Sequence, residues 1–210
     1  MDSRHLIYFS DPMCSWCWGF SPTIEAVRAA FGARAPVRLI MGGLRPGTTE
    51  PMTAEAKTQV RGHWAHVHEA SGQAFDKGGL EREGFVYDTD PAARAVVLAR
   101  RRDPDLGFAV LRAAQEAFYA RNRDVTDLEV LADLAADHGL DRAVFRAGLE
   151  AEDVKAETWR DYATSQRAGV TGFPTLIAGP RADGAYEVVT RGFQGPEPVL
   201  SAIEAWLARP

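Results

Sequence analysis

Cysteine is nearly absent from this sequence, since Cys14 and Cys17 are the only two in 210 residues. Two cysteines cannot build the network of disulfides that holds small secreted domains together. We therefore expect the fold to depend on a hydrophobic core, for which 46% hydrophobic residues in a chain of this length are sufficient. The scarcity of cysteine also makes the reducing cytoplasm the expected compartment.

Long apolar runs and a large excess of one charge are missing as well. The longest apolar run is about five residues, whereas a membrane-spanning helix needs about 20. The formal net charge is −5, and charges of both signs are interspersed. We therefore expect neither a membrane nor a nucleic acid as a partner. The sequence also shows no signal-peptide pattern, internal repeat or low-complexity linker.

The two cysteines form one Cys-x-x-Cys motif that directly follows an apolar run at residues 6–9. On the first turn of a helix, two cysteines at this spacing have Cα atoms about 5 Å apart, which suits a disulfide that opens and closes. Free N–H groups and the helix dipole at such a position favour the Cys14 thiolate, the form that attacks disulfides. Cys17, one turn further on, is then the resolving thiol.

Two other interpretations of the motif are weaker. A purely structural disulfide would close a loop too short to stabilise the fold much. Half of a zinc site would need two more ligands. His63, His66 and His68 are available, but their spacing does not place them beside the cysteines. A redox-active pair is therefore the favoured interpretation.

Hydrophobic periodicity places the motif between a strand and a helix. Residues 5–9 are predicted to form a buried strand, and residues 14–31 a helix, because apolar side chains recur there at spacings of three and four. Pro22 lies inside this helix and should kink it. A second strand is predicted at 36–41, followed by a glycine-rich loop at 42–47.

From about residue 51 to 168 the periodicity is helical almost throughout. Aromatic residues at apolar positions of these helices are predicted to be buried, namely Phe108, Phe118, Phe145 and Trp159. Beyond Gly169 the pattern predicts a strand over 170–178, a turn, a partner strand over 186–190 and a final helix that starts at Pro196.

This order of elements resembles the thioredoxin fold, and the long helical interruption is similar to the DsbA-like branch of that superfamily. The resemblance rests on Cys14-Ser15-Trp16-Cys17, on Pro22 five residues further on, and on the Gly-Val-Thr-Gly-Phe-Pro-Thr segment at 169–175. It implies an α/β protein: a thioredoxin-like fold with a large all-helical insertion. Residues 1–47 and 169–210 would form the thioredoxin-like domain, and residues 48–168 the helical insertion domain.

The resemblance also implies roles for individual residues. Cys14 would exchange with a substrate thiol or disulfide through a mixed disulfide that Cys17 resolves. Pro174 would be cis, next to the sulfurs, and the backbone of Phe173 would pair with an extended substrate. Thr175 and an exposed Trp16 would complete the substrate site. The expected partners are thiols and disulfides of proteins or small molecules, glutathione included.

No cofactor and no metal ion is expected, and the sequence makes no prediction of oligomeric state. The direction of exchange is open at this point. The strong oxidants of the family can carry a histidine between the cysteines, whereas Ser15 and Trp16 supply no positive charge. We therefore expect a milder redox couple.

Two charged residues near the motif have two interpretations each. Asp11 could cap the helix, which is the favoured role, or act as an acid or base near the sulfurs. Arg45 could contact an anionic thiol such as glutathione, but the favoured expectation is a solvated side chain.

Two further functions are alternatives to a disulfide oxidoreductase. The kappa-class glutathione transferases and the 2-hydroxychromene-2-carboxylate isomerases also resemble this chain, but they typically have serine at the position of Cys14 and no paired cysteine. A zinc-stabilised binding module is the less favoured third function.

Overall fold

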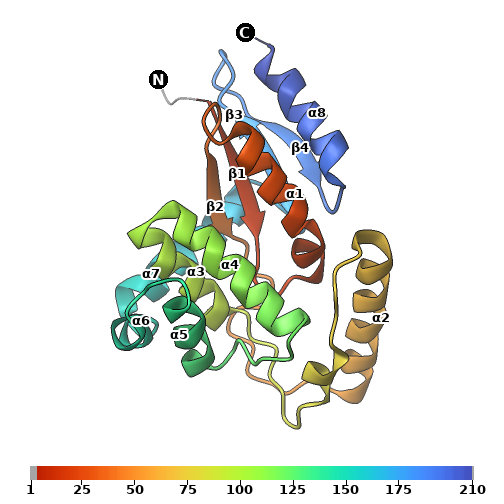
Figure 1. The fold of residues 1–210 in the computed structure, drawn as a ribbon, viewed down its shortest axis with the longest axis vertical. Helices are drawn as coiled ribbons and strands as arrows, with labels where there is room; N and C mark the ends of the chain where they lie inside the picture. The colour runs from red at the N-terminus through yellow and green to blue at the C-terminus, as the bar shows by residue number, and fades with distance from the viewer. Residues whose placement is uncertain (1–3, 210) are drawn as a thin grey trace.

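The structure is a computed structural model that describes residues 4–209. Within these residues a four-stranded sheet forms the centre of the molecule, with the strand order β2-β1-β3-β4 (Figure 1). Its strands are β1 (His5–Ser10), β2 (Val37–Met41), β3 (Thr175–Gly179) and β4 (Glu187–Arg191). β2 runs parallel to β1, whereas β3 is antiparallel to both β1 and β4. The two ends of the chain thus contribute neighbouring strands, as the thioredoxin-like arrangement requires.

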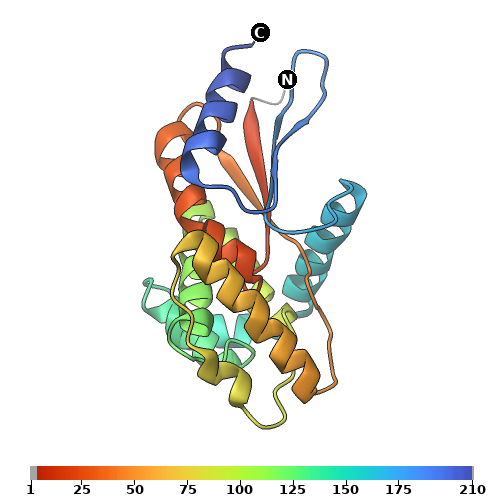
Figure 2. The ribbon, with the colours of Figure 1, turned by 90° about the vertical axis from the view of Figure 1, so that its right-hand side faces the viewer.

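Helices cover the sheet and fill the long segment between β2 and β3. In Figure 2, α1 (Ser15–Phe31) and α8 (Pro196–Leu207) lie on one side of the sheet. The other side faces α7 (Glu152–Arg167). The rest of the segment consists of α2 (Ala54–Ser71), the 3₁₀-helix η1 (Lys77–Glu81), α3 (Asp90–Arg102), α4 (Pro104–Tyr119), α5 (Leu128–Ala136) and α6 (Arg142–Gly148). The predicted fold class, α/β with a large helical insertion, is therefore confirmed.

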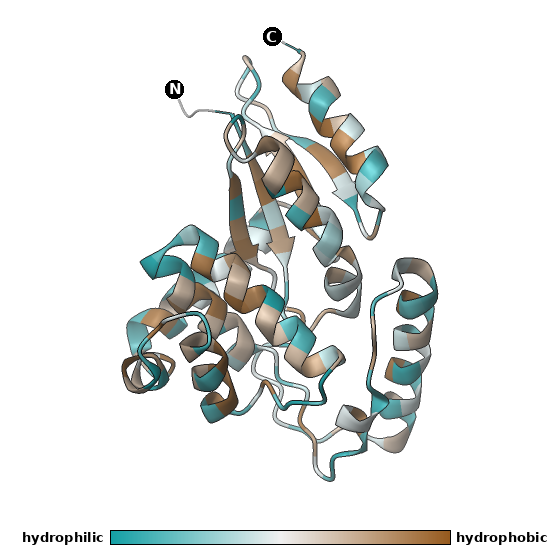
Figure 3. Cartoon of the chain, viewed as in Figure 1, coloured by the Kyte–Doolittle hydropathy of each residue, from teal (hydrophilic) through white to brown (hydrophobic). Residues whose placement is uncertain are grey.

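The apolar periodicity of α1 explains how the helix packs on the sheet. Its predicted apolar stripe is buried, and the ring of Phe20 lies 5.8 Å from that of Tyr8 on β1. Pro22 lies inside the helix and is exposed to solvent. Figure 3 shows that apolar residues dominate the strands, whereas α2 is largely polar. Only Trp64 and Val67 of α2 are buried among its described side chains.

The helical segment packs closely against α1 near the cysteine motif. A Cβ atom at Gly19 would lie only 3.0 Å from the Val67 side chain, so the absence of a side chain lets α2 approach α1. The indole N–H of Trp18 donates to the Ala74 carbonyl at 3.0 Å. The Arg112 guanidinium of α4 stacks over the same indole ring, 4.3 Å from its centroid. The first turns of α1 are thereby fixed from several sides.

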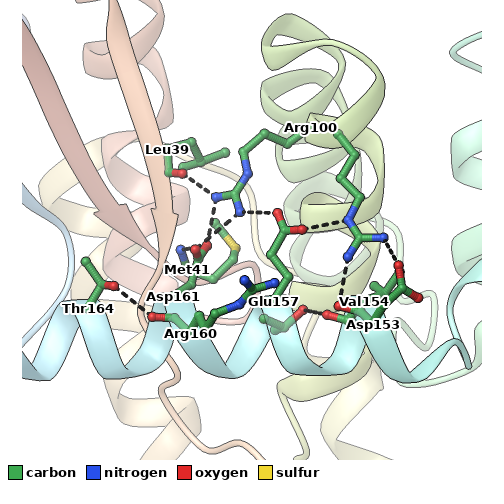
Figure 4. A network of polar contacts seen from close by, with 11 residues as sticks. Leu39, Met41, Arg100, Asp153, Val154, Glu157, Arg160, Asp161 and Thr164 are labelled. Atoms are coloured by element: carbon green, nitrogen blue, oxygen red, sulfur yellow. Dashed lines mark hydrogen bonds and ion pairs between the residues drawn. The ribbon is translucent and has the colours of Figure 1, made fainter.

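Side chains of α3 and α7 protect the outer edge of the sheet (Figure 4). The Asp161 carboxylate accepts a hydrogen bond from the Met41 N–H, and Arg100 donates to the Leu39 carbonyl. Arg100 also pairs with Asp161 at 2.7 Å and with Glu157 at 3.1 Å. Because unpaired edge groups invite association with other strands, this network both closes β2 and ties it to the insertion.

Two predictions about individual segments are wrong. Phe108, Phe118 and Phe145 are buried as expected, but Trp159 is 53% exposed, because it lies on the outer side of α7 and contacts only the edge of Tyr162 among aromatic rings of the described residues. The strand predicted over 170–178 begins only at Thr175. Residues 170–174 form a loop instead, in which the Phe173 carbonyl points to the cysteine motif rather than to a neighbouring strand.

Candidate functional site

The cysteine motif lies where the chain leaves β1 and enters α1. Cys14 is the N-cap residue of the helix, and its sulfur accepts a hydrogen bond from the Cys17 N–H at 3.3 Å. This is the position expected from the sequence, at which unpaired N–H groups of the first turn face the sulfur. Both cysteines are free thiols, with exposed fractions of 5% for Cys14 and 0% for Cys17.

The loop before β3 meets the motif although 159 residues separate them in sequence. The Phe173–Pro174 peptide bond is cis, as the family resemblance implied. The Cys14 thiol donates to the Phe173 carbonyl, with 3.6 Å between Sγ and oxygen. Thr175 lies beside them but is buried, and its hydroxyl donates to the Gly172 carbonyl at 2.8 Å. Its side chain therefore fixes the loop rather than facing solvent.

Trp16, expected to be exposed, is half-buried. Its ring packs between His66 of α2, at 5.6 Å between centroids, and Phe193 of the loop after β4, at 5.7 Å. The expectation of an exposed ring fails because two distant segments partly cover the indole. His66 is thus an aromatic neighbour of the motif. Among residues 4–209 there is no group of three or more His, Cys, Asp or Glu side chains that could hold a metal ion.

Asp11 does not cap α1, which corrects the favoured prediction. Cys14 takes the capping position, while the Asp11 carboxylate is fully buried and accepts hydrogen bonds from the Met13 N–H at 2.9 Å and the Leu44 N–H at 2.8 Å. Burial penalises the charged form and raises the pKa of Asp11 to about 6, although the two N–H groups partly offset this. A buried carboxyl that titrates near neutral pH therefore lies at the motif.

Arg45 is exposed, as expected, and is held by an aromatic contact. Its guanidinium lies 5.2 Å from the centroid of the Tyr87 ring, whose hydroxyl donates to the Met13 carbonyl at 2.7 Å. The Tyr87 and Tyr119 hydroxyls are 3.4 Å apart, and burial raises the pKa of each. Sequence reasoning missed both tyrosines, since an apolar-stripe position does not reveal which hydroxyl will turn toward a distant motif.

The surroundings of Cys14 disfavour its ionised form. Burial raises the pKa of the Cys14 thiol well above its usual value, and so do the hydrogen bond to Cys17 and the negative charge of Asp11. The hydrogen bond from the Cys17 N–H acts in the opposite direction but is the smaller effect. Stabilisation of the thiolate by the helix terminus, expected from the sequence, is therefore outweighed by desolvation.

The comparison with protein families decides the identity of this arrangement. A model of the DSBA-like thioredoxin domain matches residues 5–203. The chain belongs to this family. As a member of this family it has a thioredoxin fold, here with the paired cysteines Cys14 and Cys17.

Solved structures of DsbA-family proteins match the chain over nearly its whole length. A Nitrosomonas europaea protein provisionally assigned as a protein disulfide isomerase is 34% identical, with a TM-score of 0.90 and 98% of each chain covered. The cytosolic disulfide reductase DsbM from Pseudomonas aeruginosa is 29% identical, with a TM-score of 0.79, 97% of this chain covered and 98% of that one. DsbM has also been solved with GSH.

Curated relatives of this DsbA-family chain are longer than the chain itself. The ClpXP adapter protein SpxH from Halalkalibacterium halodurans is 25% identical over 175 residues. These residues cover 80% of the present chain but only 56% of that relative. None of the helices formed by the described residues has the length and apolar character needed to cross a membrane.

Proposed function

We propose that this protein reduces disulfides, with Cys14 as the attacking thiol and Cys17 as the resolving thiol. The observation that carries the proposal is the environment of Cys14. Its sulfur is placed at the start of α1 and against the Phe173 carbonyl, as an attacking sulfur must be, yet its pKa is raised by burial. Among the described residues, no cationic side chain contacts the Cys14 sulfur.

The direction follows from what stabilises each redox state. A disulfide centre is strongly oxidising when its reduced form is stabilised, most directly by a stable thiolate. Here burial and Asp11 both destabilise the Cys14 thiolate, so the reduced form gains no such stabilisation. The disulfide form is relatively favoured, and the reduced protein tends to pass its electrons on. The structural neighbour DsbM is a cytosolic disulfide reductase, which agrees with this direction.

The chemical steps use only the two thiols and a proton acceptor. The Cys14 thiolate attacks one sulfur of the substrate disulfide, which forms a mixed disulfide and releases the first substrate thiol. Cys17 then attacks the Cys14 sulfur, which releases the second thiol and leaves the Cys14–Cys17 disulfide. Asp11 is ionised above about pH 6 and is the buried base that we assign to the proton lost by the attacking thiol.

The substrate site that we propose surrounds the exposed side of Cys14. The Phe173 backbone next to cis-Pro174 would pair with an extended substrate, and the half-buried Trp16 ring would offer it an apolar contact. Thr175 would act by fixing the loop through Gly172. Disulfides of proteins and of small thiols such as glutathione are the proposed substrates, the latter supported by the structure of DsbM with GSH.

We propose that the thioredoxin-like domain and the helical insertion domain contribute different parts of the site. Residues 1–47 and 169–210 supply both cysteines and the cis-proline loop, whereas residues 48–168 supply the surrounding wall through His66 and Tyr87. The proposed compartment is the reducing cytoplasm, in which a reductase can be kept reduced. The similarity to the cytosolic DsbM supports this assignment.

The reduction potential tests the proposed direction. The protein would be equilibrated with glutathione and dithiothreitol buffers, and the reduced fraction would be read from tryptophan fluorescence, since Trp16 and Trp18 flank Cys17. We expect a potential closer to that of thioredoxin, about −270 mV, than to that of the strongest oxidants, about −120 mV. A value near the latter would contradict the proposal.

The glutathione-dependent isomerase or transferase activity is the alternative that the same protein can test. A Cys14→Ser, Cys17→Ser double variant should lose all disulfide exchange. If this variant still isomerised 2-hydroxychromene-2-carboxylate at the rate of the unmodified protein, the thiols would not be the reacting groups and the alternative would be favoured.

A further inference from the structure

A small pocket lies behind the cis-proline loop, at the end of the sheet nearest Cys14. Its volume is about 150 Å³, and it is enclosed by residues 168–173 on one side and by the adjoining ends of β3 and β4 on the other. Side chains from these strands that line it are Thr175, Ile177, Val188 and Arg191. In the sheet, Thr175 is paired with Arg191 and Ile177 with Val188, and a register shift between these two pairs lets Val188 and Arg191, three residues apart, both line the pocket.

The pocket has the polar groups of an anion site at its edge. Arg191 is exposed, and its guanidinium has no acidic partner within residues 4–209. The backbone N–H groups of Thr171 and Gly172 donate to no acceptor in that part of the chain either. No aspartate or glutamate lines the pocket. A guanidinium and free backbone N–H groups are the donors that bind carboxylates in proteins.

The rest of the lining limits what the anion can be attached to. Ile177 and Val188 give an apolar floor, which suits a short aliphatic group next to the charge. Since a water molecule occupies about 30 Å³ in the liquid, the volume accommodates only the end of a peptide. The chemistry therefore fits a terminal carboxylate with its last residue, as in the glycine end of a small peptidic thiol.

One residue, Phe173, contacts both the pocket and the reacting sulfur. Phe173 lines the pocket, and its carbonyl contacts the Cys14 sulfur at 3.6 Å. An extended peptide advances about 3.3 Å per residue, so a tripeptide whose end is held in the pocket can pass along the loop to Cys14.

We propose that this pocket binds a terminal carboxylate of a small peptidic disulfide, of which glutathione disulfide is the type, with Arg191 as the specificity-determining residue. The inference rests on the proposed function, since it names the class of disulfide that Cys14 reduces. In the reaction, reduced protein and glutathione disulfide give a mixed disulfide at Cys14 and one glutathione, and attack by Cys17 then releases the second glutathione and oxidises the protein by two electrons.

Single-turnover oxidation of the reduced protein tests the assignment. Stopped-flow tryptophan fluorescence would give second-order rate constants for glutathione disulfide and for its tetramethyl ester, which lacks the carboxylates but has the same sulfurs. For Arg191→Ala we expect the rate constant for glutathione disulfide to fall about ten-fold, which is the loss of one exposed charge-assisted hydrogen bond, while that for the ester stays constant. Arg191→Lys should restore part of the difference, because the charge is kept.

A matched control distinguishes a local site from general electrostatics. Arg45→Ala removes another exposed arginine without an acidic partner among the described residues, this one on the Tyr87 side of the motif. We expect it to keep the preference for glutathione disulfide over the ester. Equal losses for both substrates in Arg191→Ala, no loss for either, or a selective loss in Arg45→Ala instead would overturn the inference. If neither disulfide oxidises the unmodified protein, the inference fails, and the proposed function fails with it only if a protein disulfide does not oxidise the protein either.

Discussion

The buried Asp11 carboxyl makes the stability of this protein depend on pH in a way that one substitution can reveal. Asp11 has an exposed fraction of 0%, and its pKa rises from 3.8 to about 6 on folding, chiefly because burial penalises the charge. Between about pH 4 and pH 6 the folded protein therefore holds a proton that the unfolded chain has lost. The stabilisation associated with this group is complete below pH 4 and is lost as the pH rises to about 6.

The size of the effect follows from the shift. Each pKa unit corresponds to 1.36 kcal/mol, so a rise from 3.8 to about 6 makes the folded state less stable by about 3 kcal/mol at pH 7.5 than at a pH well below 3.8, of which about 2 kcal/mol falls between pH 4 and pH 7.5. Asp11→Asn removes this dependence, because an amide does not titrate. It also weakens one of the hydrogen bonds from the Met13 and Leu44 N–H groups, which costs about 1–3 kcal/mol at every pH.

The measurement is the difference in the free energy of unfolding between Asp11→Asn and the unmodified protein. Urea unfolding of both proteins at several pH values from 4 to 7.5 gives this difference, in which other buried carboxyls such as Asp161 cancel. We expect the variant to be the less stable protein at pH 4 and to gain about 2 kcal/mol relative to the unmodified protein by pH 7.5.

Repeating the series on the disulfide forms separates the carboxyl from the thiols. Asp11 is buried with both cysteines as free thiols, and we expect the relative gain to persist in the disulfide form, in which Cys14 and Cys17 cannot ionise. A difference that stays constant within about 0.5 kcal/mol across the pH range would refute the reasoning. It would mean that water or a rearranged loop solvates the carboxylate, and that Asp11 is no buried base.

Two further variants test the assembly of the site. Cys17→Ala should leave Cys14 joined to its substrates, so mixed disulfides should accumulate in cells and be visible on non-reducing gels; their absence would argue against the resolving role. A Cβ at Gly42 would overlap the Phe173 ring, so Gly42→Ala should cost about 1–3 kcal/mol and slow disulfide exchange. Gly62→Ala is its control, since nothing lies within 4 Å of the added carbon and both properties should be retained.

The raised pKa of Cys14 and the ionisable Asp11 together determine how the site reacts. The buried thiol loses its proton with difficulty, which favours the disulfide form and a low potential, while a nearby base lets the thiol react at neutral pH. Removal of the Asp11 charge lowers the pKa of Cys14, because its negative charge is one cause of the increase. The pH profile of Cys14 alkylation in Asp11→Asn should therefore shift to lower pH.

Local sequence by itself determined the motif and the elements that flank it. The Cys-x-x-Cys spacing, the apolar strand before it and the stripe on α1 depend on neighbours within a few residues, so the positions of Cys14 and Cys17 at the start of a helix could be predicted. The same holds for most helices between β2 and β3, whose periodicity is strong. The fold class followed from the order of these elements together with a family resemblance.

Tertiary structure alone decided the surroundings of the sulfurs. Asp11 turned from an expected cap into a buried carboxyl because Leu44 and Met13 offer their N–H groups to it, and Trp16 became half-buried because His66 and Phe193 close over it. The Met13 contact is local, but the contacts with Leu44, His66 and Phe193 join segments far apart in sequence and cannot be predicted from the local pattern. The pKa values of the site depend on burial, which arises only when distant segments pack together. The same holds for the pocket beside Arg191, which the cis-proline loop and the ends of β3 and β4 enclose.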